Sequence, residues 1–567
     1  MPDYFRQAAG RHLALYSIVC CILAWVIPNH YYPWAAFYND FFFGLSIFLL
    51  ALYVLLSHRS KTLTLPTACS VLFVVSLLPL FQWCIGKISF VGDAYIASLY
   101  LSGFGCAYCV GYLISGHHVA EAMKYISATV LGGALLSTTL AIAQWLSIDT
   151  FGMWLADLPF ASRPYANLGQ PNNLATLLML GLVSCLYLHA IGVLRRWVGV
   201  AIYLVFGVAL TQSRTAWLMF GLLGCWWVLR RGGGLTPIPA KYFAVLILSY
   251  GLFFSVVTDV HAAYFMMSGG VGSGWSLGTS GRYEIWMQMY KALCEMPLFG
   301  YGWNQVSVAQ VSVAENFSNH DFVGTMTEYS HNLLLDLLIW NGWLVGLTLI
   351  YIVCAWCVSR AAAVRTLESS FALLLVATLL VHAMLEYPLA YAYFLFPLGV
   401  FLGVVDREIA VRVMQIRMSV AVVVVAGLGF MLGWVWNDYR AVEEDYRLMR
   451  FETARIGSVV QVGASPDVNL LTQLREFIRF ARTEESDAMT GAEISWMQMV
   501  AHRYPYVPSL SRSALALGLN GYEEAAAIEL ARLKALHGDV VYLSVLNKLD
   551  EYEAGRQSAD VNAERAK

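Results

Sequence analysis

Long apolar runs recur through the first three quarters of this chain and restrict its fold more than any other feature. A helix needs roughly 20 apolar residues to cross a hydrocarbon core of about 30 Å, and a bilayer admits only segments whose backbone hydrogen bonds are satisfied. Charged residues make up 13% of the chain, against about a quarter in average soluble domains. We therefore predict an all-α polytopic membrane protein with about 13 transmembrane helices. The runs lie at 12–28, 41–57, 66–85, 94–115, 125–148, 172–191, 197–212, 215–229, 241–258, 333–357, 370–387, 391–405 and 418–436.

Lysine and arginine are concentrated in every second loop between these runs. Because positive residues accumulate on the cytoplasmic side of a membrane, the N-terminus and the Lys/Arg-rich loops are predicted to be cytoplasmic. An odd number of spans then places the polar loop 259–331 and the C-terminal segment outside. The first run has no small-residue cleavage site after it, so we interpret it as a retained span. The Lys/Arg-poor loops before residue 437 contain five such residues, Lys87, Arg163, Arg214, Arg282 and Lys291.

Composition changes abruptly after residue 436. The segment 437–567 is charged, contains no cysteine and carries helical patterns such as LLTQLREFIRFARTEE. Another stretch, NGYEEAAAIELARLKALH, is similar to one helix pair of a tetratricopeptide repeat, although one unit does not make an array. The segment is either a small helical domain on the outer face or a domain that binds a partner. We predict membrane helices over 1–160, a membrane core over 161–405, a last membrane helix over 406–436, and an outer helical domain over 437–567.

A histidine stands at the entrance of a predicted membrane helix. In EYSHNLLLDLLIWNGW, His331 and Asn332 directly precede the apolar run that begins at residue 333. The unpaired N–H groups at a helix N-terminus create positive potential, which favours a neutral imidazole able to accept a proton. Asp336 lies one turn inside the same helix. A carboxylate within a membrane helix suggests function, although a hydrogen bond to Asn332 would also explain it.

Three arginines on the predicted outer side suggest a binding site for an anion. Arg163 lies in ASRPYANLGQPNN, Arg214 in TQSRTAW and Arg282 in TSGRYEIW. Planar guanidinium groups bind phosphate oxygens bidentately, so these side chains suit the pyrophosphate of a lipid whose tail stays in the bilayer. A single arginine at this depth is more often an interfacial anchor. Three in polar contexts, on the arginine-poor side, favour a functional interpretation.

Two further positions join this group. Gln170 precedes Pro171 in the Gly-Gln-Pro-Asn-Asn turn that opens the run at 172–191, where proline suits a first helical turn. Glu386-Tyr387-Pro388 breaks the chain at the outer end of the run at 370–387. Capping or kinking would explain either position without a functional role.

The outer loops contain no cluster of Asp, Glu, His or Cys at metal-ligand spacing. The chain contains neither a P-loop nor a dinucleotide fingerprint. The two CxxC pairs lie within apolar runs, where cysteine is usually a small core residue. We therefore expect no metal, no cofactor and no nucleic-acid partner.

Four motifs in order carry a family resemblance: NLGQPNNLATLL, TQSRTAW, GRYEIW followed by PLFGYGWNQV, and SHNLLLDLLIWNGWLVG. They resemble the O-antigen ligase/polymerase superfamily. The Gln-Pro-Asn turn and the large C-terminal domain resemble its PglL-type bacterial protein O-oligosaccharyltransferases. The resemblance covers about residues 160–400, so the segment 161–405 is expected to be a ligase-like core.

This resemblance implies an enzyme of the bacterial inner membrane. The implied reaction moves a preassembled oligosaccharide from undecaprenyl pyrophosphate to Ser or Thr hydroxyls of periplasmic proteins such as pilins, without a metal and with inversion at the anomeric carbon. His331 matches the essential loop histidine of the family, and Arg214 and Arg282 match the arginines that hold the pyrophosphate. Gln170 and Tyr387 match positions tied to activity. Arg163 is proposed from its location only, and Asn332, beside His331, is also predicted to bind substrate.

Two alternatives to this function differ in kind. An O-antigen ligase or polymerase would perform the same chemistry on lipid A-core or on another glycan. A transporter or lipid flippase would instead place its binding groups near the bilayer midplane, within broken helices of related halves. The polar groups of this chain gather at one face, and its sequence has no evident internal repeat. Transfer to an acceptor outside the membrane is therefore preferred to transport.

Overall fold

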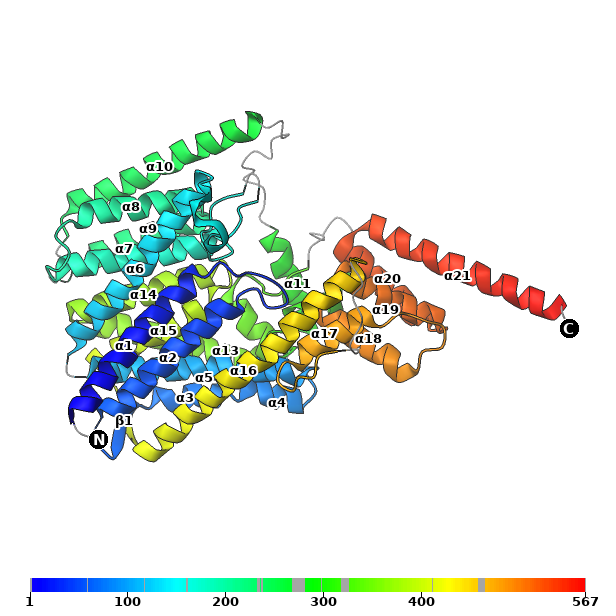
Figure 1. Cartoon of the computed structure of the whole chain (residues 1–567), viewed down its shortest axis with the longest axis horizontal. Helices are drawn as coiled ribbons and strands as arrows, with labels where there is room; N and C mark the ends of the chain where they lie inside the picture. The colour runs from blue at the N-terminus through cyan, green and yellow to red at the C-terminus, as the bar shows by residue number, and fades with distance from the viewer. Residues whose placement is uncertain are drawn as a thin grey trace. The chain divides into compact units, whose positions relative to one another are not determined.

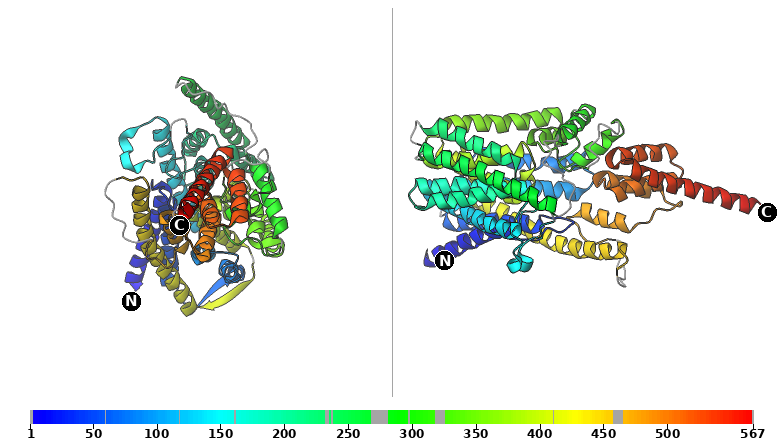
Figure 2. Two further views of the ribbon diagram at one scale, coloured as in Figure 1. Left: turned by 90° about the vertical axis from the view of Figure 1, so that its right-hand side faces the viewer. Right: turned by 90° about the horizontal axis from the view of Figure 1, so that it is seen from above.

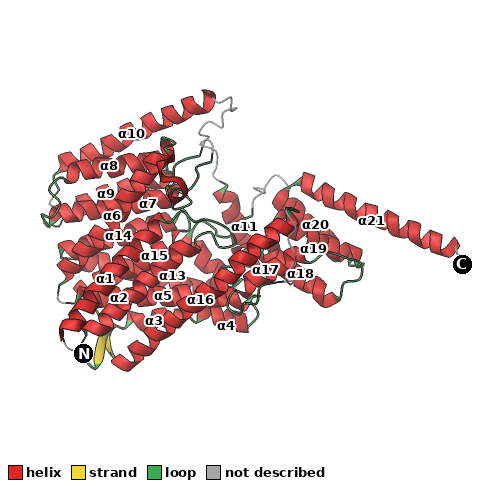
Figure 3. Cartoon of the chain, in the orientation of Figure 1, coloured by secondary structure: helices red, strands yellow, loops and turns green. Residues whose placement is uncertain are grey.

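The computed structural model describes residues 3–565 except 59, 117, 160–161, 232–234, 236–237, 268–280, 297, 318–325, 410 and 457–464. Helices dominate the described residues (Figure 3), which confirms the all-α class. Each of the thirteen apolar runs coincides with helical structure. Within the described part, eight helices are long and apolar enough to cross a membrane on their own. The number of about 13 membrane spans therefore stays a prediction. The predicted domain boundaries after residues 160, 405 and 436 stay predictions as well.

The run at 66–85 forms two short helices instead of one long helix. The first, α3, spans Ala68–Val75, and the second, α4, spans Leu78–Cys84. The hydroxyl of Ser76 donates to the carbonyl of Phe73 at 2.7 Å, and Pro79 occupies the first turn of α4. A proline in the first turn has no N–H to lose and is preorganised for a helix start. These residues explain why the helix is interrupted here.

The chain forms two compact units, and each of them gathers stretches that are distant in sequence (Figure 1). Unit 1 consists of 1–76, 99–276 and 353–436, and unit 2 of 77–98, 277–352 and 437–567. Three helices have residues in both units: α5 (Val91–Ser115), α13 (Leu333–Ala363) and α16 (Met418–Thr453). The other elements of unit 1 are α1 (Asp3–Val26), α2 (Phe37–Ser57), β1 (Thr62–Pro66), α3, α6 (Val119–Trp145), η1 (Asp149–Trp154), α7 (Pro171–Ala190), α8 (Trp197–Leu210), α9 (Arg214–Arg230), α10 (Ala240–Met267), α14 (Leu367–Ala383), η3 (Pro388–Ala390), α15 (Ala392–Glu408) and β2 (Val413–Arg417).

Helix α7 is the most deeply buried of the eight long apolar helices, with 89% of its span inside the protein. Helices α6, α8, α9 and α14 pack around it. Its sequence after the first turn, LATLLMLGLVSCLYL, is apolar on every side, as expected for a helix surrounded by others. The Gln-Pro-Asn turn therefore stands at the start of a helix that other helices of unit 1 surround.

Unit 1 also contains a small sheet, which the sequence patterns did not predict. Strands β1 and β2 pair antiparallel, with Thr62 opposite Arg417 and Pro66 opposite Val413 (Figure 3). Strand β2 alternates between exposed and half-buried residues, as an edge strand with one solvated face does. The ribbon joins two loops that are predicted, from their lysines and arginines, to be cytoplasmic.

Unit 2 contains the segment that leads into α13 and the whole described C-terminal segment from residue 437 on. Its C-terminal helices pack in sequential pairs, with α19 on α18 and on α20. Helix α21 continues beyond them as a single rod (Figure 2). The elements wholly within unit 2 are α4, α11 (Arg282–Glu295), α12 (Val306–Ala314), α17 (Thr472–Arg482), α18 (Gly491–Arg503), α19 (Val507–Leu519), α20 (Glu523–His537) and α21 (Asp539–Arg565).

The last apolar helix does not end at residue 436. Helix α16 continues without a break to Thr453, and its extension carries charged residues such as Arg440 and Glu443, joined by an ion pair of 2.5 Å. A helix can leave an apolar environment without ending because its backbone hydrogen bonds are internal. The change in composition after residue 436 therefore does not coincide with the end of a helix.

Candidate active site

Four of the predicted residues stand at helix N-termini. Gln170 is the residue that precedes α7, Arg214 is the first residue of α9 and Arg282 is the first residue of α11. His331 lies two residues before α13. The first N–H groups of a helix have no partner within it and carry positive potential. A guanidinium group added at this position makes such an end more attractive to an anion.

In unit 1, hydrogen bonds bring together the segment around Arg163, the turn before α9 and the end of α14. A guanidinium nitrogen of Arg163 donates to the carbonyl of Gln212 at 3.2 Å. Asn172 accepts a hydrogen bond from the hydroxyl of Ser213 at 2.7 Å and donates one to Glu386 at 3.1 Å. Asn172 thus links the start of α7 to the residue before Arg214 and to the residue before Tyr387.

Two charged side chains, Arg214 and Glu386, act electrostatically on Arg163 in this cluster. Burial lowers the pKa of Arg163, and the charge of Arg214 lowers it further, whereas the carboxylate of Glu386 opposes both effects. Arg163 is half-buried, Arg214 is exposed and Glu386 is only 5% exposed. Two guanidinium groups act on one another here with one carboxylate beside them, so the cluster keeps a net positive charge of the kind that suits an anion.

Gln170 and Tyr387 both border this cluster. Gln170 is half-buried and has extended backbone, with φ −146° and ψ 133°. Tyr387 is half-buried as well, and its ring centre lies 6.1 Å from that of Tyr391. The structure therefore brings Arg163, Gln170 and Tyr387 to the same end of unit 1 as Arg214.

In unit 2, His331 has a left-handed backbone, with φ 59°. This conformation is uncommon for residues other than glycine, and it is kept only where the surroundings enforce it. The backbone N–H of the preceding residue, Ser330, donates to the carboxylate of Asp336 at 2.8 Å. Asp336 also interacts electrostatically with His331. Ser330 is thus one partner of Asp336.

The side chain of Asn332 has a structural role in this conformation. Its Oδ1 accepts from the backbone N–H groups of Leu334 and Leu335, at 3.0 and 3.1 Å. Asparagine is among the preferred residues for such a cap. A substrate-binding role for Asn332 stays a prediction. The cap determines the direction in which the chain leaves His331.

Arg282 belongs to a helix that contacts the His331 segment. One turn after Arg282, Trp286 donates its indole N–H to the carbonyl of Ser330 at 2.8 Å. Helix α11 begins after Gly281, which has φ 57°, a conformation that glycine adopts readily. Arg282 and His331 are therefore carried by segments joined through Trp286.

The helix that follows His331 is interrupted at Gly342, where φ is 72°. A Cβ on Gly342 would lie 2.4 Å from the carbonyl oxygen of Leu298, so the motif PLFGYGWNQV passes directly against the break. The backbone N–H of Tyr301 donates to the carbonyl of Ile339 at 2.8 Å. Glycines in the two motifs PLFGYGW and IWNGW thus allow their backbones to approach closely. This contact supports the part of α13 that lies between His331 and Gly342.

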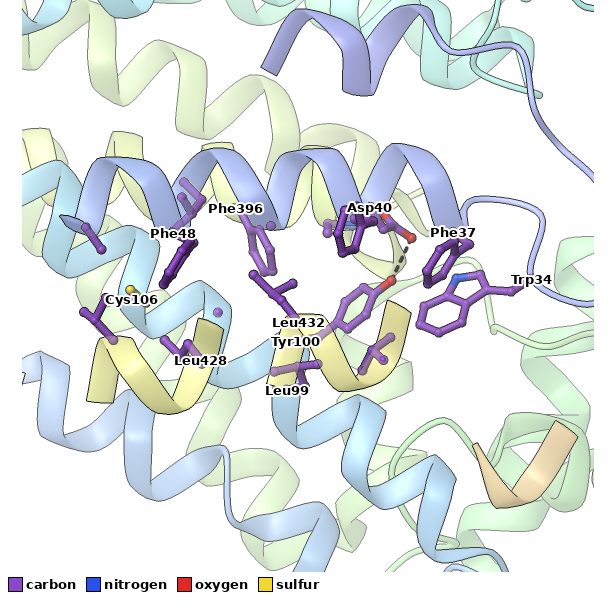
Figure 4. A pocket seen from close by; sticks show the side chains of 18 residues that line it. Trp34, Phe37, Asp40, Phe48, Leu99, Tyr100, Cys106, Phe396, Leu428 and Leu432 are labelled. Carbon is purple, nitrogen blue, oxygen red and sulfur yellow. Dashed lines mark hydrogen bonds between the residues drawn. The ribbon is translucent and has the colours of Figure 1, made fainter. Parts of the chain in front are cut away.

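An apolar slot lies elsewhere in unit 1, between α2, α5, α15 and α16 (Figure 4). Its empty volume, open side included, is about 670 Å³. Asp40, near one end, accepts hydrogen bonds from the hydroxyl of Tyr100 at 2.7 Å and from the N–H of Ala392 at 2.6 Å. None of the seven predicted residues, all of which the structure describes, lines this slot. Its walls suit hydrocarbon and offer little to a sugar.

Among the described residues, no three His, Cys, Asp or Glu side chains stand close enough to hold a metal ion. Asp321, an acidic residue of the loop 259–331, lies outside the described residues. The expectation of a metal-independent reaction therefore stays a prediction, to be tested in solution.

Sequence reasoning missed the residues that hold the candidate residues in place. Asn172 and Ser213 are direct neighbours of singled-out positions, and their polarity at the edge of an apolar run was a usable signal. Gln288 and Gln310 form a hydrogen bond of 3.0 Å with each other. They gave no signal in the sequence, because single glutamines on separate helices form no pattern. Such partners become evident only in three dimensions.

Three families match successive parts of the chain. The families are described as protein glycosylation ligase, over residues 164–189, O-antigen ligase, over 198–352, and virulence factor membrane-bound polymerase, C-terminal, over 370–546. The middle match contains Arg214, Arg282 and His331. The first contains Gln170 and Asn172.

Two curated proteins from Acinetobacter baylyi (strain ATCC 33305 / BD413 / ADP1) are similar over most of the chain. A general O-oligosaccharyltransferase is 31% identical over 546 residues, which cover 93% of this chain and 92% of that protein. A ComP-specific O-oligosaccharyltransferase is 28% identical over 397 residues, which cover 68% of this chain and 69% of that protein. These relations and the helical membrane architecture define a membrane glycosyltransferase. The chain belongs to the bacterial O-oligosaccharyltransferases of the O-antigen ligase family.

Proposed function

We propose that this protein glycosylates other proteins by moving a preassembled oligosaccharide from undecaprenyl pyrophosphate to Ser or Thr hydroxyls of periplasmic acceptors such as pilins. The observation that carries this proposal is the setting of His331. His331 stands at a helix start, and its backbone is held in the left-handed conformation. Trp286 joins the His331 segment to the helix that begins with Arg282. The relatives named O-oligosaccharyltransferases support the choice of reaction.

The reaction is proposed as a direct displacement at the anomeric carbon. His331 takes the proton of the acceptor hydroxyl while the oxygen forms a bond to that carbon. The bond from the anomeric carbon to the pyrophosphate oxygen breaks, and its electron pair leaves with undecaprenyl pyrophosphate. Attack from the side opposite the leaving group inverts the anomeric configuration. Pyrophosphate is a good leaving group, so stabilisation of its charge is the main further requirement.

That stabilisation is assigned to arginine. Arg282 lies on the helix joined to the His331 segment, and we assign it to an oxygen of the pyrophosphate. Arg214, with Arg163 near it, is likewise proposed to bind phosphate. Gln170 and Tyr387, which border that cluster, are proposed to orient the donor. Asn332, whose side chain caps the start of α13, is also proposed to bind substrate.

The proposed location is the bacterial inner membrane. The N-terminus is proposed to lie in the cytoplasm, and His331 and residues 437–567 on the periplasmic side. The unequal distribution of Lys and Arg between alternate loops supports this orientation. The same face then carries the donor's pyrophosphate and meets acceptors that have already crossed the membrane.

A second candidate changes the acceptor and keeps the chemistry. Residues 370–546 match a family described as a membrane-bound polymerase, which favours transfer to another glycan. Such an enzyme would need the same base and the same phosphate-binding groups. The two candidates differ only in where the glycan is found after the reaction.

Mass spectrometry of periplasmic proteins and analysis of lipopolysaccharide, from cells with and without the gene, separate these candidates. We expect glycopeptides that disappear with the gene and return when the gene is restored, with lipopolysaccharide unchanged. A loss of polymer or of lipid A-linked glycan, with protein glycosylation intact, would establish the second candidate instead.

A further inference from the structure

Arg503, the last residue of α18, forms a buried two-bond ion pair with Asp93 at the start of α5. Its Nε and one terminal nitrogen donate to the two carboxylate oxygens of Asp93 at 2.8 and 2.9 Å. The two side chains are only 14% and 6% exposed. A fork of this kind combines charge with fixed geometry. Removing one partner would leave a buried charge without compensation.

The same residue also reaches toward the segment that leads to His331. The carboxylate of Glu328, three positions before His331, interacts electrostatically with Arg503. The hydroxyl of Ser307, in α12, donates to the backbone carbonyl of Arg503 at 3.1 Å. Arg503 of the C-terminal domain therefore bonds to the start of α5 and to α12. It also attracts Glu328 in the segment that precedes His331.

Helix α12 forms a second connection between the C-terminal domain and this segment. On one side, Gln310 accepts from the backbone N–H of Thr327 at 2.9 Å and donates to Gln288 of α11 at 3.0 Å. On the other side, Val311 and Ala314 are buried in a core with α18, α19, α20 and α21. Displacement of the C-terminal helices would thus move α12 and, with it, the backbone at Thr327.

The C-terminal domain has little freedom where it meets α5. A Cβ on Gly92 would lie 1.9 Å from the Gln473 side chain and 2.6 Å from the carbonyl of Leu470. The backbone N–H of Gly92 donates to the hydroxyl of Thr472 at 2.9 Å. The residue beside Asp93 is therefore a glycine because the C-terminal segment lies directly against it.

We propose that Arg503 is a positioning residue for His331, and that its pairing with Asp93 uses the C-terminal domain to hold residues 326–332 in their active conformation. This inference rests on the proposed function, since it assigns His331 a catalytic role. It makes the C-terminal domain part of the catalytic apparatus, beyond any part in acceptor binding. Arg503 acts through the His331 segment and touches no substrate.

The test measures catalysis and backbone protection on the purified full-length enzyme. In Arg503→Ala, kcat should fall about 10²-fold, as expected when a catalytic group is misplaced by about 1 Å, with KM for the lipid-linked donor little changed. Hydrogen exchange of the amides at 327–336 should be faster. Arg503→Lys should recover part of the kcat and of the protection, because it keeps the charge and loses the fork.

Arg512→Ala is the matched control, because Arg512 forms an ion pair of 2.9 Å with Glu485 inside the same domain. It should leave kcat and the exchange of 327–336 at wild-type values, at a comparable thermal stability. If Arg503→Ala does not fold, Asp93→Asn replaces it with the same expectations. Wild-type kcat, or a lower kcat with unchanged exchange at 327–336, would overturn the proposal. His331→Ala, assayed in parallel, reports on the proposed function independently of the exchange measurement.

Discussion

The indole N–H of Trp286 donates to the carbonyl oxygen of Ser330 at 2.8 Å. This bond joins the helix headed by Arg282 to the residue directly before His331. Because Ser330 is also held by the carboxylate of Asp336, the left-handed turn at His331 is fixed from two sides. The proposed base and the proposed phosphate-binding group are thus carried by joined segments, an arrangement that favours catalysis by orientation.

Substitution of His331 tests the proposed base. His331→Ala should reduce transfer by about 10²–10⁴-fold, while expression and donor binding persist, because a proton acceptor acts mainly in the transition state. His331→Gln, which can form hydrogen bonds but cannot take the proton, should be almost as inactive. Glycosylation of a co-expressed acceptor, followed by mass spectrometry, measures each variant.

The control for this experiment is His118→Ala, at an exposed histidine that precedes α6, and it should be fully active. A fully active His331→Gln would limit His331 to orienting the acceptor or shaping the helix start. Asp336 and Glu386 would then be the next candidates for the base.

Arg214 and Arg282 should depend on geometry as well as on charge. Arg→Lys at either position keeps the charge but loses the bidentate fork and should impair transfer, and Arg→Ala should impair it more. The effect should appear as weaker donor binding or as a lower kcat. Arg230→Ala, at the opposite end of the same helix as Arg214, is the matched control. Normal transfer by both Ala variants at equal protein levels would make these residues interfacial anchors.

Removal of metal ions should leave the enzyme active. The proposed reaction uses an imidazole base and guanidinium groups and needs no Lewis acid. Treatment of the purified enzyme with EDTA should therefore change the initial rate little. A clear loss that Mg²⁺ or Mn²⁺ restores would show that a metal takes part.

The orientation can be read from reporter fusions. Alkaline phosphatase folds only outside the cytoplasm, so a fusion after Lys567 should be active and a fusion after Arg365 inactive. A green fluorescent protein at the same two positions should give the opposite pattern. A well-expressed but inactive C-terminal phosphatase fusion would refute the proposed orientation.

Acid should weaken the C-terminal domain through Glu529. Burial favours its neutral form, but a hydrogen bond from His502 at 3.1 Å and the charge of Arg532 outweigh burial and hold the pKa of Glu529 below its usual value. Its contribution to stability is therefore complete above the unfolded pKa of about 4.3 and is lost as the pH falls through the folded pKa. Glu529→Gln should lower the free energy of unfolding by roughly 1.5–3 kcal/mol at neutral pH.

Thermal unfolding of the purified protein between about pH 7 and pH 2 measures this effect. The wild type should lose more stability than Glu529→Gln over that range, because the variant has no carboxylate to protonate. Parallel losses would place the acid-sensitive groups elsewhere.

Much of the architecture follows from local sequence. Each apolar run became helical structure because a bilayer-length apolar segment has few other ways to satisfy its backbone. The runs around residues 76 and 436 were less predictable. The run at 66–85 is divided by the end of α3 and by the proline in the first turn of α4. Helix α16 continues past residue 436, since a change in polarity does not by itself end a helix.

The sequence by itself determined which residue types stand at the candidate site, namely the arginines, the histidine and the Gln-Pro-Asn turn, because their chemistry and their place at the ends of apolar runs are local properties. Only the tertiary structure decided how they are held. The link from Asn172 to Glu386, the left-handed turn at His331 and the pairing of Arg503 with Asp93 each join segments or set a conformation that no periodic pattern records. Side-chain hydrogen bonds between distant segments depend on where the folded backbone brings them, and that placement is set by the packing of the whole unit.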